Sequence, residues 1–145
     1  MYKRILVPLE NTRTDRAILE HVVQLAKHAG ASLVLIHVAD GFAARNLKQL
    51  DLRESEEMRK DRAYLDETSA RLVSEGLQVD AVLASGDPPS EIIEAADREH
   101  CDLIAMGTHG HRWVKDILFG SVAEAVRHRT LVPVLMVRQS PEPDA

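Results

Sequence analysis

The segment GTHGHRWVKDILFGS, residues 107–121, combines residue types that can hold an anion. Its glycines, Gly107, Gly110 and Gly120, permit positive φ angles and let a ligand approach the backbone closely. Gly120 and Ser121 are expected to open a helix, whose free N–H groups and dipole favour negative charge. This chemistry is suited to a phosphate group.

The same residues also fit a simpler interpretation. Ser121 and Glu124 have the spacing of a capping box, which needs no ligand. Gly107 could merely end a strand, and Gly110 could merely make a turn. The nucleotide signatures G-x-x-x-x-G-K-[ST] and G-x-G-x-x-G are absent from the sequence. Spacing alone therefore leaves a phosphate site and an ordinary turn both open.

The elements around this segment follow from hydrophobic periodicity. Short apolar runs predict five strands, and amphipathic runs between them predict four helices, with residues 40–53 irregular. The predicted strands are 5–9, 32–38, 79–84, 103–106 and 133–137, and the predicted helices are 14–29, about 54–74, 88–99 and 120–128. Strict alternation predicts a doubly wound, mostly parallel α/β sheet with helices on both faces.

Thr14 is expected to cap the first helix and Gly30 to end it, and Asp87 is expected to cap the third. If the strand order is 3-2-1-4-5, strands one and four meet where the winding reverses, which is where such sheets bind ligands. Residues 8–11 would then face the glycine segment across one crevice.

Composition excludes several classes of protein. A length of 145 residues with 45% hydrophobic and 28% charged residues suits one compact domain. A net charge of −5 and only 3% aromatic residues argue against a nucleic-acid binder. No apolar run reaches the roughly 18 residues of a membrane span, and the N-terminus lacks a signal-peptide core. We therefore expect a cytoplasmic protein that contacts neither nucleic acid nor membrane, with its one cysteine, Cys101, as a packing residue.

Taken together, these motifs resemble the universal stress protein family, the UspA-like domain. The resemblance covers residues 2–138 and rests on ILVP at 5–8, LIHV at 35–38, VPVLMV at 132–137 and the pattern G-x2-G-x9-G-[ST] ending at Ser121. That pattern is similar to the ATP-binding branch of the family. The resemblance implies the five-stranded 3-2-1-4-5 sheet of adenine nucleotide alpha-hydrolase-like proteins, as one domain at 1–138 with a C-terminal tail at 139–145.

The resemblance also implies a site for ATP, with AMP, ADP or a cyclic nucleotide as alternatives and Mg²⁺ possible beside the phosphates. The implied nucleotide contacts are Pro8, Leu9, Glu10, Val38, Met106, Gly107, His109, Gly110, Gly120, Ser121 and Val122. Where the family usually has Asp, this chain has Glu10, which is one methylene longer. Its carboxylate either accepts a hydrogen bond from the nucleoside or fills part of the pocket.

The function implied is that of a nucleotide-binding sensor or regulator in a stress response, dimerising through its last strand at residues 133–137. The alternatives are a slow ATPase or phosphotransfer enzyme, and a dimeric interaction module that binds no nucleotide. We assign no catalytic residue, because Ser121 lacks the G-x-S-x-G elbow of a nucleophile. We assign no metal site, because His109 and His111 lack an obvious third ligand.

Overall fold

The computed structural model describes residues 1–40, 47–109 and 117–140, and of residues 40, 47–55, 109 and 117–120 it describes the backbone. The elements in chain order are β1 (Arg4–Pro8), α1 (Asp15–Ala29), β2 (Ser32–Asp40), α3 (Leu47–Ser74), β3 (Val79–Gly86), α4 (Pro88–Arg98), β4 (Leu103–His109), α5 (Ile117–Arg129) and β5 (Val134–Gln139).

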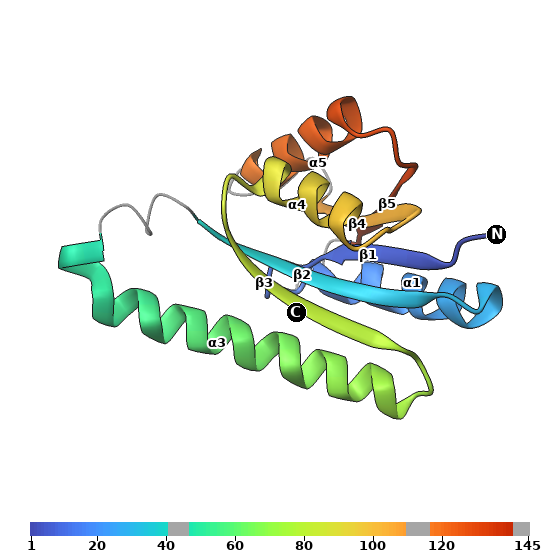
Figure 1. Ribbon diagram of the computed structural model, residues 1–145, viewed down its shortest axis with the longest axis horizontal. Helices are drawn as coiled ribbons and strands as arrows, with labels where there is room; N and C mark the ends of the chain where they lie inside the picture. The colour runs from blue at the N-terminus through green and yellow to red at the C-terminus, as the bar shows by residue number, and fades with distance from the viewer. Residues whose placement is uncertain (41–46, 110–116, 141–145) are drawn as a thin grey trace.

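The strands form a parallel sheet in the order β3-β2-β1-β4-β5, which confirms the predicted fold class. Helices α1 and α3 cover one face, and α4 and α5 cover the other (Figure 1). Strands β1 and β4 are neighbours, so the winding reverses between them. We call the side at which the strands end the carboxyl edge and the opposite side the amino edge.

Strand β1 lies at the centre of the core because its side chains alternate between two apolar layers. Ile5, Leu6 and Val7 are all 0% exposed. Ile5 and Val7 belong to the layer under α1 and α3, whereas Leu6 belongs to the layer under α4 and α5. A strand buried on both faces is expected in a parallel sheet covered by helices, and here it fixes the position of the residues that follow Pro8.

The ends of the helices differ in part from the prediction. Gly30 ends α1 with φ 68° as predicted, but Thr14 at its start makes no side-chain capping hydrogen bond. Helix α3 begins at Leu47, so the prediction of an irregular segment was wrong for residues 47–53. Those residues are mostly strong helix formers whose charges hid the apolar periodicity. Asp87 caps α4 as predicted, accepting from the backbone N–H of Ser90 at 3.3 Å.

The glycine segment is placed differently from the prediction. Strand β4 continues to His109, with Gly107 paired to Val137, so Gly107 lies inside the strand and not after it. Helix α5 begins at Ile117, so Gly120 and Ser121 lie within it and do not open it. The predicted capping box was therefore wrong. Strand β4 continues beyond Met106, its last large apolar residue, because residues 107–109 pair with β5. The apolar pattern of the sequence does not reveal this pairing.

Strand β5 is shifted relative to the prediction: it runs from Val134 to Gln139, not from residue 133 to 137. Pairing with β4 through His109 and Gln139 extends it into polar sequence. The remaining tail residues, 141–145, lie outside the described part of the chain, as do residues 41–46.

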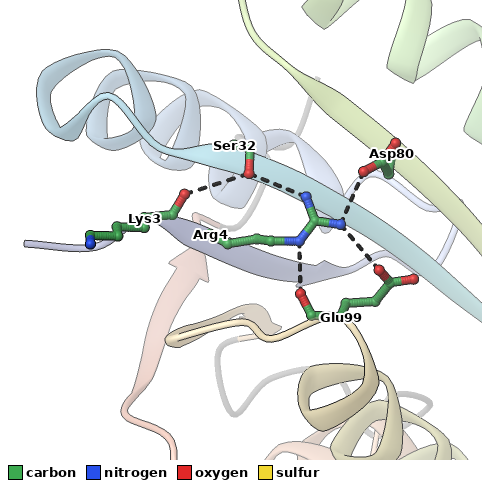
Figure 2. Close-up of polar contacts among 5 residues, drawn as sticks. All are labelled: Lys3, Arg4, Ser32, Asp80 and Glu99. Atoms are coloured by element: carbon green, nitrogen blue, oxygen red, sulfur yellow. Dashed lines mark hydrogen bonds and ion pairs between the residues drawn. The ribbon is translucent and has the colours of Figure 1, made fainter.

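The amino edge is tied together by one arginine (Figure 2). Arg4 donates from Nε to the carbonyl of Glu99 at 2.8 Å and from Nη1 to Ser32 Oγ at 3.2 Å. Its Nη2 lies 3.0 Å from the carboxylate of Asp80 and 3.1 Å from that of Glu99. This cluster joins β1, β2, β3 and the end of α4, which lie far apart in sequence.

Candidate functional site

A cavity of about 720 Å³ opens at the carboxyl edge of the sheet, between the ends of β1 and β2 and the helices α4 and α5. Its apolar lining consists of Pro8, Leu9, Ile36, Val38, Pro88, Pro89, Ile92, Val122 and Ala125. Its polar lining consists of Glu10, Thr12, His37, Asp87 and Ser121. A mostly apolar wall with a few polar groups is typical of sites for small organic ligands.

The cavity brings together predicted site residues from three separate parts of the chain. Those that line it are Pro8, Leu9, Glu10, Val38, Ser121 and Val122. Glu10 is partly exposed, and its carboxylate accepts a hydrogen bond from the Thr12 hydroxyl at 3.3 Å. Ser121 and Val122 reach the cavity from the second turn of α5, which begins at Ile117.

Two other predicted contacts are buried in the fold. Met106 is 0% exposed and belongs to the apolar layer under α4 and α5. A Cβ on Gly107 would stand 3.0 Å from the carbonyl oxygen of Thr14 and 3.3 Å from Ile18 Cγ2. The close packing of β4 against α1 therefore explains this glycine, and its contact with a nucleotide stays a prediction.

The remaining predicted contacts belong to the glycine segment. His109 ends β4 and Gly120 lies in α5, and the structure describes the backbone of both. Gly110 lies outside the described residues, and so do His111 and the other residues up to Asp116. Their roles stay predictions.

The backbone after β1 is held by the carboxylate of Asp15. This side chain accepts from the backbone N–H groups of Glu10 and Asn11, both at 2.9 Å. Asn11 has φ 63°, a left-handed conformation that asparagine tolerates better than most residues. Asp15 is only 3% exposed, and burial raises the pKa of its carboxyl in spite of the hydrogen bonds that favour its charged form. Glu10 is thus positioned by a buried acid five residues further along.

Helix α3 completes the support of this loop. The Tyr64 hydroxyl donates to Oδ2 of Asp15, and burial together with this hydrogen bond raises the pKa of Tyr64. One turn earlier on α3, Asp61 accepts from the side-chain amide of Asn11 at 3.3 Å. The loop is therefore clamped between the start of α1 and the middle of α3.

His37 joins the same network from β2. Its Nδ1 lies 2.8 Å from the carbonyl oxygen of Leu9, which can only accept, so Nδ1 carries a proton. Its Nε2 lies 3.2 Å from the Asp61 carboxylate. His37 is thus a hydrogen-bonded residue at the margin of the cavity.

The described residues contain neither a grouped set of metal ligands nor a membrane-spanning helix. Within residues 1–40, 47–109 and 117–140, no three His, Cys, Asp or Glu side chains are grouped to hold a metal ion. In the same part of the chain, no helix has the length and apolar character needed to cross a membrane.

Sequence patterns missed the residues that act through tertiary contacts. Asp15 looks like an ordinary first-turn acid of a helix, and Tyr64 and Asp61 lie in a highly charged helix. Their partners are 49 and 50 residues away in the chain. One feature of the sequence could have drawn attention to Tyr64: it is one of only two tyrosines in a chain with 3% aromatic residues.

Comparison with known proteins places the chain in a family. A model described as "Universal stress protein family" matches residues 1–138. Universal stress protein MJ0577 of Methanocaldococcus jannaschii is 29% identical over 159 aligned positions, which cover 96% of each chain. The solved structure of MJ0577 covers 98% of this chain and 99% of its own, with a TM-score of 0.86.

Two further solved structures share the fold and were determined with nucleotides. A universal stress protein in complex with cAMP covers 96% of this chain and 98% of its own, with 22% identity and a TM-score of 0.68. A universal stress protein of Archaeoglobus fulgidus in complex with dAMP covers 94% of this chain and 98% of its own, with 22% identity and a TM-score of 0.66. On the family match over residues 1–138, this chain belongs to the universal stress protein family.

Proposed function

We propose that this chain binds an adenine nucleotide, ATP in the first place, in the carboxyl-edge cavity. The observation that carries the proposal is the meeting of Pro8, Glu10 and Val38 with Ser121 and Val122 around one cavity. Its volume of about 720 Å³ lies within the range of roughly 300–1,000 Å³ that small-ligand pockets occupy. Its place beside the winding reversal is the usual ligand position in such sheets.

The chemistry of the lining supports an adenine nucleotide in particular. The apolar wall suits a flat base, and the Glu10 carboxylate can accept from a ribose hydroxyl or an adenine amino group. Ser121 lines the cavity from α5, and its hydroxyl can donate a hydrogen bond to a phosphate oxygen. The family members solved with cAMP and dAMP have ligands that share the adenine and a phosphate.

Titration calorimetry tests the proposal directly. ATP, ADP, AMP and cAMP are each titrated into the protein, with and without Mg²⁺, and GTP serves as the control for the base. We expect saturable binding of at least one adenine nucleotide, tighter than that of GTP. No binding of any of the four at millimolar concentration would refute the site. Mg²⁺ should strengthen binding of ATP more than of AMP, because it neutralises the added phosphates.

We further propose that the nucleotide acts as a signal and not as the substrate of a fast enzyme. Ser121, which lines the cavity from the second turn of α5, lacks the G-x-S-x-G elbow that activates a serine nucleophile. Binding would instead change the surface around the cavity, which a partner in a stress response recognises. Phosphate release that falls to background in a Ser121→Ala variant would favour the enzymatic alternative.

A homodimer through the last strand is part of the proposal. Strand β5 lies at the end of the strand order, with β4 on one side. Met136 is 37% exposed on it, whereas Val134 packs against the layer under α4 and α5. Met136→Lys should therefore shift the protein from dimer to monomer in light scattering. Leu131→Lys, at a fully exposed leucine before the strand, is the matched control. A wild-type monomer, or a dimeric Met136→Lys variant, would refute this interface.

A further inference from the structure

The loop that presents Glu10 to the cavity depends on hydrogen bonds from outside the cavity. Two of its backbone N–H groups, those of Glu10 and Asn11, donate to Asp15 at 2.9 Å each. Asn11 has φ 63°, a backbone conformation that costs free energy for a residue with a side chain. The loop therefore keeps this shape only while Asp15 keeps its own position.

The position of Asp15 is set in turn by α3. The Tyr64 hydroxyl donates to Asp15 Oδ2, the same oxygen that receives the N–H of Asn11. Tyr64 is half-buried and packs against the apolar layer under α1 and α3. The Asp15 carboxylate that accepts these hydrogen bonds is 3% exposed, and a hydrogen bond to a buried carboxylate is among the stronger ones in a protein.

A second contact from α3 reaches the same loop. Asp61 accepts from the side chain of Asn11 at 3.3 Å, and its other oxygen lies 3.2 Å from Nε2 of His37. His37 itself holds the carbonyl of Leu9 at 2.8 Å. Residues on both sides of Glu10 are thus fixed by partners one turn apart on a helix that contributes nothing to the described cavity lining.

We propose that Tyr64 is a positioning residue for the nucleotide site: acting through Asp15, it holds the backbone of residues 10–12 so that the Glu10 carboxylate meets the nucleoside. The inference rests on the proposed function, because it concerns affinity for the same ligand. It makes α3 a determinant of that affinity. A displacement of α3, for example by a partner bound to its outer face, would then weaken nucleotide binding without touching the cavity.

The test is the variant Tyr64→Phe, which removes one hydroxyl and keeps the ring in its apolar surroundings. The matched control is Tyr2→Phe, at the other tyrosine of the chain, which is also half-buried but lies before β1 at the amino edge. We expect Tyr64→Phe to weaken binding of AMP and ATP by the same factor, about threefold to tenfold, which is less than the full loss of one charge-assisted hydrogen bond because Asp15 keeps its hydrogen bonds from Glu10 and Asn11. The shared factor is expected because both ligands carry the same nucleoside.

Two further measurements separate positioning from mere stabilisation. The backbone N–H groups of Glu10 and Asn11 should exchange with solvent faster in Tyr64→Phe, because Asp15 holds them less firmly. In a double-mutant cycle, Tyr64→Phe should weaken binding much less when Glu10 has already been replaced by Ala. If Tyr64→Phe weakens binding by the same factor in the wild-type protein and in the Glu10→Ala variant, the proposed action through Glu10 is wrong.

The possible failures are distinguishable. If the wild type binds no adenine nucleotide, the proposed function itself is refuted. If the wild type binds and Tyr64→Phe binds equally well, the positioning role alone is refuted, even where the variant unfolds at a lower temperature. Should Tyr64→Phe fold poorly, Asp15→Asn addresses the same contact from its other side. It leaves one acceptor oxygen for three donors and should weaken binding by at least as large a factor.

Discussion

At the amino edge of the sheet, Arg4 bridges Asp80 and Glu99 directly, whereas at the carboxyl edge the buried Asp15 holds backbone N–H groups that carry Glu10. Both clusters join segments far apart in sequence. The first fastens element ends to one another (Figure 2), and the second fastens a loop that borders a cavity of about 720 Å³. We therefore expect the amino edge to contribute mainly to stability and the carboxyl edge to contribute to the proposed nucleotide binding.

The strongest way to break this comparison is to fill the cavity. Val38 lies at its wall near the end of β2 and is partly buried. Val38→Phe places a larger side chain in the space that we assign to the base. Overpacking of this kind costs about 1–3 kcal/mol, so nucleotide affinity should fall about tenfold to 100-fold in calorimetry.

The control for this variant is Val73→Phe, at a residue of α3 that is 52% exposed and lies away from the cavity. It should bind as the wild type does. Equal affinity in Val38→Phe would show that the ligand lies elsewhere.

The matching change at the amino edge is Arg4→Met, which keeps the length of the side chain and removes its hydrogen bonds. Arg4 is 25% exposed and donates to Glu99, Ser32 and Asp80. Because the partly buried Glu99 carboxylate loses its partner, we expect a loss of about 2 kcal/mol in the free energy of unfolding, measured with urea. Nucleotide affinity should stay within twofold of the wild type.

Arg98→Met, at an exposed arginine of α4, is the control and should cost much less. If Arg4→Met weakened nucleotide binding while leaving stability unchanged, the division between the two edges would be wrong.

Asp87 tests the division between the two edges with a smaller expected effect. It lies at the carboxyl edge, yet it stabilises a helix. It lines the cavity and caps α4, and hydrogen bonds from Ser90 lower the pKa of its carboxyl. Asp87→Ala should reduce the free energy of unfolding by about 1 kcal/mol at pH 7. With a folded pKa below the unfolded one, this contribution is present above the unfolded pKa and is lost as pH falls through the folded value.

The difference between wild type and Asp87→Ala should therefore shrink below about pH 4, near the ordinary pKa of aspartate. Asp87→Asn keeps a capping oxygen without the charge and should show little of this pH dependence. A constant difference between wild type and Asp87→Ala from pH 7 to pH 3 would contradict a role for the carboxylate charge.

The agreement between sequence and structure follows the range of the interactions. The apolar run at 5–9 and the helix ended by Gly30 were predictable because burial and φ preferences act locally. The start of α3 at Leu47 was not predictable, because charged residues mask the apolar spacing of its first turns. The place of Gly107 inside β4 was not predictable either, because it depends on pairing with β5.

By itself, the sequence determined the order and type of the elements and the presence of Glu10 and Val38 at or near strand ends. These follow from hydrophobic periodicity, which each segment carries within itself. Only the tertiary structure decided that Tyr64 reaches Asp15 across 49 residues and that Arg4 reaches Glu99 across 95. Such contacts depend on how helices pack on the sheet, and no local pattern of residue types encodes that packing.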